Sequence, residues 1–327
     1  MIVETKGLTK YYGKVRGVED LDLVVREGEV FGYLGPNGAG KTTTIRLILD
    51  LIRPTRGTAL LFGQEVRGHA AELKTRLGVL PGELALWSNL TARDLLTFLG
   101  NLRGGLDWVW VDELAQRLDL DLSRRVGTFS HGNKQKVGLL QAFAHKPGLL
   151  ILDEPTTGLD PLIQQEFYRL IDEVKAEGRT VFLSSHILPE VDRVCDRVGI
   201  IREGHLVAVE EIAELKRKRL RHMELTFSQP VPPSAFDLPG VRDVVQTGSS
   251  LCFFVDEAPG SLDGVVKRAA QFQLLDMRHE QATLEDIFLT YYRKQDTGAG
   301  AVPTEGSLGA QRRRPRGRPR EGDDVAA

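Results

Sequence analysis

The fold is decided by the stretch Gly35-Pro36-Asn37-Gly38-Ala39-Gly40-Lys41-Thr42-Thr43. It satisfies the pattern G-x-x-x-x-G-K-[ST], which forms a phosphate-binding loop when a strand precedes it and a helix follows it. Here Glu29–Leu34 predicts the strand, and an apolar helix is predicted from about Lys41. Glycines let backbone N–H groups approach phosphate oxygens, the lysine adds a positive charge at the β/γ-phosphates, and the Thr42 hydroxyl ligates Mg²⁺. The stretch therefore predicts a nucleotide-binding α/β fold.

A second motif lies where the apolar run Leu149–Asp153 is followed by Glu154. Two carboxylates at the end of a buried strand are costly without a metal, a proton or a positive partner. Asp153 is predicted to hold Mg²⁺, directly or through water, and Glu154 to polarise the water that attacks the γ-phosphate. An acidic pair that caps the next loop is the alternative. Beside a phosphate loop, the pair predicts a P-loop nucleotide hydrolase.

The surrounding pattern predicts a parallel sheet covered on both faces. Leu21–Val25 and Thr180–His186 are further predicted strands, and Pro161–Lys175 is an amphipathic helix. Residues 82–146 change to apolar residues at three- and four-residue steps, which indicates a helical insertion. The expected fold class is a P-loop NTPase with a RecA-like α/β core and a helical subdomain.

Five motifs together resemble the ATP-binding subunit of ABC transporters, of the ABC-2 or drug-exporter type (daunorubicin-resistance-like). They occur in family order with family-like spacing over residues 1–215. They are the loop at 35–43, the segment Phe129–Lys136, the strand end at 149–154, Gly158-Leu159-Asp160, and Ser185-His186. The resemblance implies ATP and Mg²⁺ as ligands and a homodimer that sandwiches two ATP molecules.

The resemblance also assigns roles to single residues. Ser130 and Gly132 match the signature residues that begin a helix facing the γ-phosphate bound by the other subunit, as a helix N-terminus suits an anion. Asp160 resembles the aspartate that crosses the dimer interface, and His186 the histidine that contacts the γ-phosphate. Tyr12 occupies the position of the aromatic residue that stacks on adenine, and Val18 that of an apolar residue supporting this ring.

The chain departs from the family pattern at two places. The family signature usually reads Leu-Ser-Gly-Gly-Gln, and in this chain Phe129, His131 and Asn133 replace three of its residues. His131 is interpreted either as a tolerated solvent-facing side chain or as a weak extra contact. At Gly82 the family glutamine that ligates Mg²⁺ is missing, and we expect either Glu83 or water to supply the oxygen.

An apolar cluster at Leu84–Trp87 lies where the family forms a groove for a permease helix. Trp87 is the candidate permease contact. Ordinary packing inside the helical subdomain is an equally open interpretation, because large aromatic side chains are usually buried.

The charged segment Glu210–Arg221 is predicted as a helix that leads toward Gln229–Ser234 (QPVPPS), interpreted as a hinge or boundary. Residues 216–295 are predicted to form a small α+β domain with a hairpin around Gly248 and a helix from Ser261. Its ending, Ala282–Leu289, resembles the domain appended to drug-exporter ABC ATPases, and Thr283 with Asp286 fits a capping box. Dimer contacts or regulation are the expected roles.

Residues 296–327 are predicted to be a disordered tail, because they contain no aromatic residue and few large aliphatic ones. A basic run in this tail could touch anionic lipid or nucleic acid, or be simply solvated. It comprises Arg312, Arg313, Arg314, Arg316, Arg318 and Arg320. Acidic neighbours reduce the net charge of the tail to +1, which favours solvation.

The composition of the 327-residue chain excludes several protein classes. Lys and Arg total 43 against 45 Asp and Glu, a net charge of -2 that argues against a nucleic-acid partner. The longest uncharged runs are about 12 residues, such as Val244–Val255, far short of a membrane span. No signal peptide is apparent, and the two cysteines suit a reducing cytoplasm.

The sequence thus predicts an ATP-binding and hydrolysing subunit of an ABC exporter. We expect it in the cytoplasm, peripheral on the inner face of the membrane through a separate ABC-2-type permease. The alternative is a soluble ABC ATPase that acts on nucleic acid or the ribosome. Such proteins usually carry coiled coils, a second cassette or zinc modules, and none is apparent in the sequence.

Overall fold

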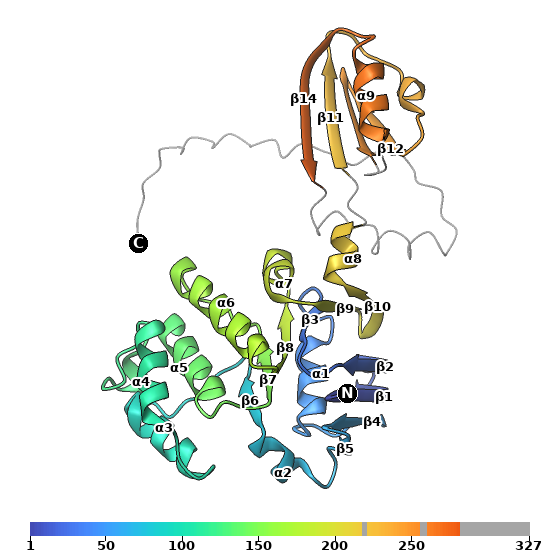
Figure 1. Cartoon of the computed structure of the whole chain (residues 1–327). Helices are drawn as coiled ribbons and strands as arrows, with labels where there is room; N and C mark the ends of the chain where they lie inside the picture. Colours follow the sequence, from blue (N-terminus) through green and yellow to red (C-terminus); the bar gives the residue numbers. More distant parts are fainter. Residues whose placement is uncertain (218–220, 256–259, 282–327) are drawn as a thin grey trace, which may run out of the picture.

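The computed structural model describes residues 1–217, 221–255 and 260–281. Within these ranges the strands form three sheets, two in the N-terminal part of the chain and one in the C-terminal part (Figure 1). The predicted capping box of Thr283 and Asp286, with the helix expected to start there, and the tail 296–327 lie outside the described residues.

The central sheet has the order β10-β9-β3-β8-β7-β6, in which only β10 is antiparallel to its neighbour. Its strands are β3 (Val30–Leu34), β6 (Leu77–Leu80), β7 (Leu149–Asp153), β8 (Thr180–Ser185), β9 (Arg197–Arg202) and β10 (His205–Glu211). Every residue of β3, β7 and β8 is buried, as expected for a sheet covered on both faces. The predicted parallel sheet is confirmed.

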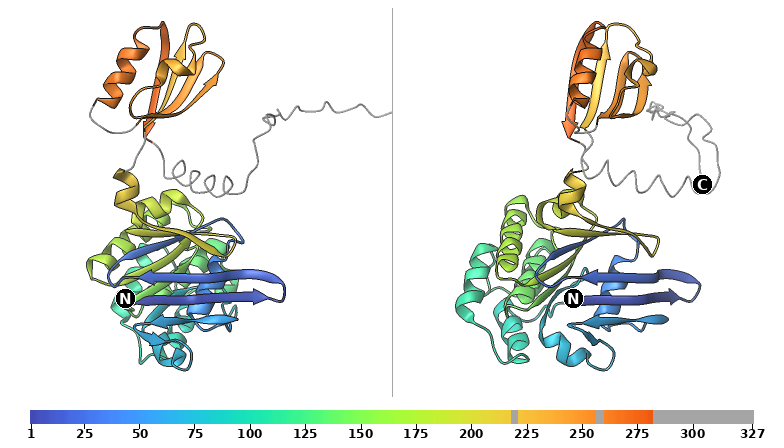
Figure 2. Two further views of the ribbon diagram at one scale, coloured as in Figure 1. Left: turned by 90° about the vertical axis from the view of Figure 1, so that its right-hand side faces the viewer. Right: turned by 45° about the vertical axis from the view of Figure 1, so that its right-hand side comes forward.

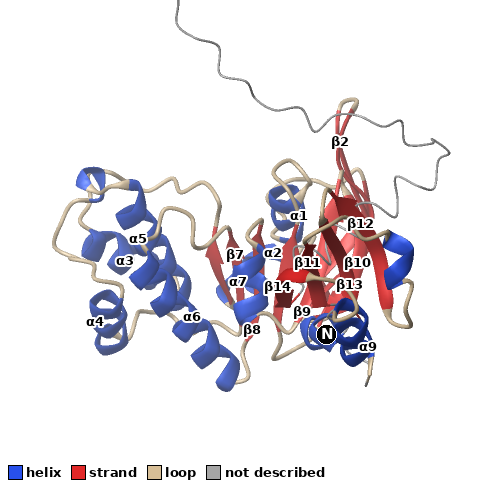
Figure 3. Cartoon of the chain, turned by 90° about the horizontal axis from the view of Figure 1, so that it is seen from above, coloured by secondary structure: helices blue, strands red, loops and turns tan. Residues whose placement is uncertain are grey.

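The two faces of this sheet bury alternate residues of the same strands. On one face, Leu150 and Leu152 of β7 pack with helices that lie on one side of the sheet in Figure 3. These helices are α3 (Ala92–Asn101), α4 (Trp108–Arg117), α5 (His131–Phe143), α6 (Pro161–Ala176) and α7 (Leu188–Val194). On the other face, Leu149 and Ile151 join the core that includes α1 (Lys41–Ile48). The period of two along each strand therefore separates two cores.

An antiparallel sheet, β2-β1-β4-β5, covers α1 from the other side. Its strands are β1 (Val3–Tyr12), β2 (Val15–Val25), β4 (Arg56–Leu61) and β5 (Gln64–Glu65), and Figure 2 shows the long β1 and β2 side by side. The short helix α2 (Ala70–Thr75) follows β5, and the 3-10 helix η1 (Val126–Thr128) precedes α5. Helices α3, α4 and α5 fill much of the predicted helical segment.

The C-terminal described part is an antiparallel sheet, β12-β13-β11-β14, with its own apolar core. Its elements are β11 (Arg221–Phe227), η2 (Pro233–Phe236), β12 (Val241–Thr247), β13 (Ser250–Val255), α9 (Ser261–Ala269) and β14 (Leu274–Gln281). The predicted hairpin turn is confirmed at Gly248, whose φ of 64° suits glycine. The predicted helix from Ser261 is also confirmed.

Two expectations from the sequence are wrong in this region. The predicted helix Glu210–Arg221 begins only at Ile212, in α8 (Ile212–Arg217), because Glu210 and Glu211 pair with β9 as the end of β10, and Arg221 already belongs to β11. Ladder pairing at the sheet edge outweighs helix propensity there. The proline-rich stretch is not a hinge, since it follows β11 and buries Val231 in the core of the small sheet.

Candidate nucleotide-binding and hydrolysis site

The ends of three parallel strands bring the predicted motifs together. Leu34 pairs with Ser185, and Asp153 pairs with Ser184, so the loops after β3, β7 and β8 leave the sheet side by side. In open α/β sheets, ligands bind at the carboxyl ends of the strands. The topology therefore places the phosphate loop, the acidic pair and the histidine around one site.

The loop between β3 and α1 is shaped by its glycines. A Cβ at Gly35 would lie 2.4 Å from the carbonyl oxygen of Ile201, and one at Gly40 would lie 2.7 Å from that of Gly17. Gly40 also has a φ of 111°, which an L side chain rarely adopts. The helix begins at Lys41 without a side-chain cap, which suits an anion at the N–H groups of the first turn.

Lys41 is held inside this loop. Its side chain is 6% exposed, and Nζ donates hydrogen bonds to the carbonyl oxygens of Gly35 (2.7 Å) and Pro36 (3.2 Å). Nζ also lies 3.1 Å from Oε1 of Glu154, an ion pair inside the protein. A phosphate group suits this loop because its charge is complementary to the buried ammonium.

Thr42 and Asp153 meet as the motif predicts. The Thr42 hydroxyl donates to Oδ2 of Asp153 at 2.8 Å, and the Ser184 hydroxyl donates to Oδ1. Asp153 is 1% exposed, and these two bonds orient its carboxylate. A hydroxyl that donates to a carboxylate still has lone pairs for a cation, so this oxygen donor set fits Mg²⁺. Ser184 was not singled out from the sequence, although it immediately precedes the predicted Ser185-His186 pair.

Glu154 stands in a strained backbone position directly after β7. Its φ is 51°, and its N–H donates to both the carbonyl and the hydroxyl oxygen of Ser184, each at 3.2 Å. A left-handed conformation costs a non-glycine residue roughly 1 kcal/mol or more. This geometry directs the carboxylate toward His186, whose Nδ1 lies 2.6 Å from Oε2.

These groups line one pocket. Its lining residues are Asn37, Thr42, Arg46, Gly82, Glu83, His131, Gln135, Asp153, Glu154, Thr157 and His186. Arg46, Gln135 and Thr157 were not predicted as site residues. Gln135 donates from Nε2 to the carbonyl oxygens of Glu154 (3.3 Å) and Pro155 (3.1 Å), which ties α5 to the segment after β7.

Gly82 lies directly against the acidic end of β7. A Cβ at this position would be 3.0 Å from Oδ2 of Asp153. Glu83, expected as a possible oxygen donor, is exposed, and its Oε2 lies 3.7 Å from Nη2 of Arg46. That either Glu83 or water supplies the oxygen missing at Gly82 stays a prediction.

Gly132, one of the residues expected to act across a dimer interface, packs on the loop that precedes another of them, Asp160. A Cβ at Gly132 would lie 2.5 Å from the carbonyl oxygen of Gly158, so the signature segment packs on the loop that leads to Asp160. Ser130 is the exposed N-cap of α5, and Asp160 is the exposed N-cap of α6. Their action across an interface stays a prediction.

His131 also lies against this loop. A Cβ at Gly158 would be 2.6 Å from Cδ2 of His131, so the imidazole is in close contact with the loop. The side chain is nonetheless exposed and lines the pocket, which leaves both interpretations of it open.

Tyr12 and Val18 lie at the back of the phosphate loop. The Tyr12 ring is 46% exposed at the end of β1, and a Cβ at Gly17 would touch both this ring (3.0 Å) and Thr43 (3.1 Å). Val18 is fully buried beneath Gly40. Val18 therefore supports the loop, while the exposed Tyr12 ring remains the predicted adenine contact.

Trp87 is half exposed rather than buried. Its ring makes an edge-to-face contact with Phe98 of α3, with ring centroids 5.3 Å apart. Phe98 is 48% exposed. In the sequence, the helical spacing of apolar residues around it does not distinguish it from a core residue. Two adjacent exposed aromatic rings are consistent with a protein contact surface.

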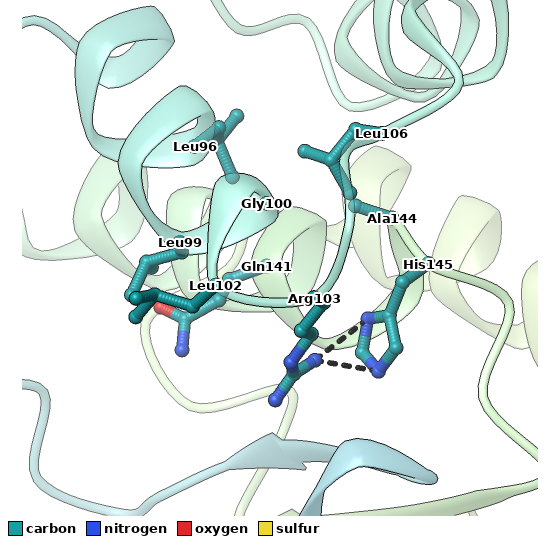
Figure 4. A pocket seen from close by; sticks show the side chains of 9 residues that line it. All are labelled: Leu96, Leu99, Gly100, Leu102, Arg103, Leu106, Gln141, Ala144 and His145. Carbon is teal, nitrogen blue, oxygen red and sulfur yellow. Dashed lines mark hydrogen bonds between the residues drawn. The ribbon is translucent and has the colours of Figure 1, made fainter.

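A second, mostly apolar pocket lies at the end of α3 beside α5 (Figure 4). His145 closes one side, with Nε2 2.9 Å from the carbonyl oxygen of Leu77, and Nη1 of Arg103 lies 2.9 Å from Nδ1 and 2.6 Å from Nε2 of the ring. Burial, together with the Arg103 charge, lowers the pKa of His145 to about 4. None of the residues predicted to bind nucleotide lines this pocket.

Comparisons with known proteins agree with this geometry. A family model described as "ABC transporter" matches residues 18–157. The chain is 40% identical over 230 residues to the bacitracin transport ATP-binding protein BcrA of Bacillus licheniformis, which covers 69% of this chain and 75% of that protein. It is 33% identical over 295 residues to the Nod factor export ATP-binding protein I of Paraburkholderia xenovorans (strain LB400), with coverages of 88% and 95%.

Among solved structures, an ATP-binding subunit of an ABC transporter superposes with a TM-score of 0.62 at 32% identity, covering 66% of this chain and 92% of that one. Over the described part of this chain, no helix is both long and apolar enough to cross a membrane.

Proposed function

The chain belongs to the ABC transporter family of ATP-binding, ATP-hydrolysing subunits, and we propose that it drives export through a separate ABC-2-type membrane permease. The observation that carries this proposal is the pocket in which Thr42, Asp153, Glu154 and His186 converge. Relatives named for bacitracin transport and Nod factor export support an exporter.

ATP would bind with its phosphates in the loop from Gly35 to Thr43. The N-terminal N–H groups of α1 and the Lys41 ammonium supply positive charge there. Tyr12 would contact the adenine from its exposed position at the end of β1. Thr42 and Asp153 are the residues that would hold Mg²⁺, and the ion would supply positive charge beside the phosphates.

Hydrolysis requires a base beside the γ-phosphate. Glu154 would accept a proton from the attacking water through its carboxylate, and His186 orients this carboxylate through the contact at 2.6 Å. The strained backbone at Glu154 fixes the direction of the side chain. Catalysis is thereby assigned to two residues on neighbouring strand ends.

We further propose that two copies close around two ATP molecules. Ser130 and Gly132 of one copy would face the γ-phosphate bound by the other, with Asp160 between them at the interface. The packing of Gly132 on Gly158 supports joint movement of these segments. The ATP-driven closure would be transmitted to the permease through the Trp87–Phe98 surface, at the inner face of the membrane.

The proposal is tested by reconstituting the chain with its candidate ABC-2 permease in lipid vesicles. We expect ATP-dependent substrate movement and ATPase stimulation by the permease, both lost with Lys41→Ala. Absence of stimulation by the permease would contradict the exporter assignment. Stimulation by nucleic acid or ribosomes instead would favour the soluble-ATPase alternative.

A further inference from the structure

Glu190 is a buried carboxyl behind the catalytic pocket for which the mechanism above has no use. It lies in the first turn of α7 and is 1% exposed. Its Oε1 atom is buried without a hydrogen-bond partner in the described residues. Burial, with the nearby Glu154 carboxylate, raises the pKa of Glu190 to about 7. A leucine would fill this position without the cost of desolvating a carboxyl, so the acidic group needs another explanation.

The first partner of Glu190 is the residue just before His186. The Ser185 hydroxyl donates to Oε2 of Glu190 at 2.5 Å and accepts from the N–H of Ile187 at 2.9 Å. A hydroxyl has a single proton to donate, and here the Ser185 hydroxyl donates it in the hydrogen bond to Glu190. The hydroxyl lone pair is thus directed at Ile187, which closes the turn that carries His186.

The same serine reaches the phosphate loop. Its carbonyl oxygen accepts a hydrogen bond from the N–H of Gly35 at 3.3 Å. The turn that Glu190 stabilises is therefore attached directly to the start of the loop that would bind ATP.

The second partner of Glu190 follows Glu154 in the chain. Thr156 is 3% exposed, and its side chain lies near the Glu190 carboxyl, where it acts to lower the pKa of this group. One buried carboxyl thus joins the segment after β7 to the turn after β8. The catalytic contact between Glu154 and His186 spans the same two segments on the pocket side.

We propose that Glu190 is a positioning residue for hydrolysis, which sets the separation of Glu154 and His186 through its hydrogen bond to Ser185 and its packing beside Thr156. This inference rests on the proposed catalytic roles of Glu154 and His186. Glu190 itself does not line the pocket. Its loss should therefore lower turnover more than it weakens ATP binding by the loop from Gly35 to Thr43.

The test is a kcat and KM comparison on the full-length chain. Glu190→Leu, which roughly keeps the volume but removes the hydrogen bond to Ser185, is expected to lower kcat at least roughly tenfold, with the KM for ATP changed less than about twofold. Glu190→Gln keeps one acceptor oxygen and should retain an intermediate kcat. The matched control is Asp172→Asn, which breaks the exposed ion pair between α6 and Arg193 of α7 (3.0 Å) and should leave kcat unchanged.

Ser185→Ala makes the inference testable even where Glu190→Leu does not fold. It removes the hydroxyl that bonds Glu190 and the N–H of Ile187, and it should also lower kcat. In the double variant with Glu190→Gln, kcat should fall by less than the product of the two single fold-reductions, because both substitutions disrupt one network.

The inference is overturned by a folded Glu190→Leu protein with a kcat within about twofold of the parent, or by single effects that multiply. Glu154→Gln distinguishes failure of the proposed catalytic role from failure of the positioning role. If Glu154→Gln retains full turnover, the proposed catalytic role fails. If it is inactive while Glu190→Leu is normal, only the positioning role fails.

Discussion

Oε2 of Glu154 and Nδ1 of His186 lie 2.6 Å apart, although 32 residues separate them in the chain. The contact joins the ends of two parallel strands, β7 and β8, which pair in register from Leu149 with Thr180 to Asp153 with Ser184. The proposed base and the residue proposed to orient it are thus placed by sheet topology rather than by a local motif.

Glu154→Gln removes the proton acceptor but preserves size and shape. We expect turnover to fall by roughly 10²- to 10⁴-fold, since this is the usual contribution of a general base. ATP binding should persist, and ATP-bound dimers should accumulate in size-exclusion chromatography. Glu177→Gln is the matched control, because Glu177 pairs at the surface with Arg179 (2.6 Å). Parent-like turnover in Glu154→Gln would remove Glu154 from catalysis.

Gly82→Ala places a methyl group 3.0 Å from Oδ2 of Asp153, the oxygen that accepts from Thr42. The methyl group should displace this carboxylate and raise the Mg²⁺ concentration for half-maximal ATPase activity by roughly tenfold, as for other changes around metal ligands. Gly82→Gln carries an added oxygen and should require less Mg²⁺ than Gly82→Ala. A Mg²⁺ titration of the three proteins measures both effects, and coincident curves would contradict them.

Trp87→Ala removes the larger ring of the exposed Trp87–Phe98 pair. If this surface receives the permease, truncation should weaken the complex by at least about 2 kcal/mol, as for interface hot spots. The ratio of permease-stimulated to basal ATPase activity should fall accordingly. Val109→Ala, at an apolar residue of α4 that is 81% exposed, should leave this ratio unchanged. Equal ratios in the two variants would exclude Trp87 from the contact.

His145 makes the stability of the chain depend on pH. The Leu77 carbonyl can only accept, so Nε2 donates to it and Nδ1 faces the Arg103 guanidinium. The folded pKa is about 4, below the ordinary value of 6.5, so the unfolded chain binds a proton that the folded chain does not. The stability contributed by the neutral ring is present above about pH 6.5 and is lost as the pH falls toward 4.

His145→Gln removes this titration while retaining an N–H donor. The urea midpoint of the parent should fall more steeply between pH 7 and pH 4.5 than that of the variant. Carboxylates titrate in both proteins, so the difference between the two curves isolates His145. Parallel curves would contradict the assignment.

Local sequence was sufficient for the phosphate loop, the acidic strand end and the parallel sheet. The loop between Gly35 and Lys41 requires glycines at close backbone contacts, and such requirements are visible as residue identities. The buried strands β3, β7 and β8 appear as runs without charge, apart from Asp153 at the end of β7, because both faces are covered. These features depend on neighbours along the chain, which a linear pattern records.

Other features depend on contacts between distant segments, and only the tertiary structure decided them. Ser184 orients Asp153 across two strands, and Phe98 extends the surface at Trp87. Glu190 looks in the sequence like a surface residue of a short helix, yet it is buried and bonded to Ser185. Hydrophobic patterning reports which face of a strand or helix is apolar, but a polar side chain is buried only where a partner from elsewhere in the fold satisfies it.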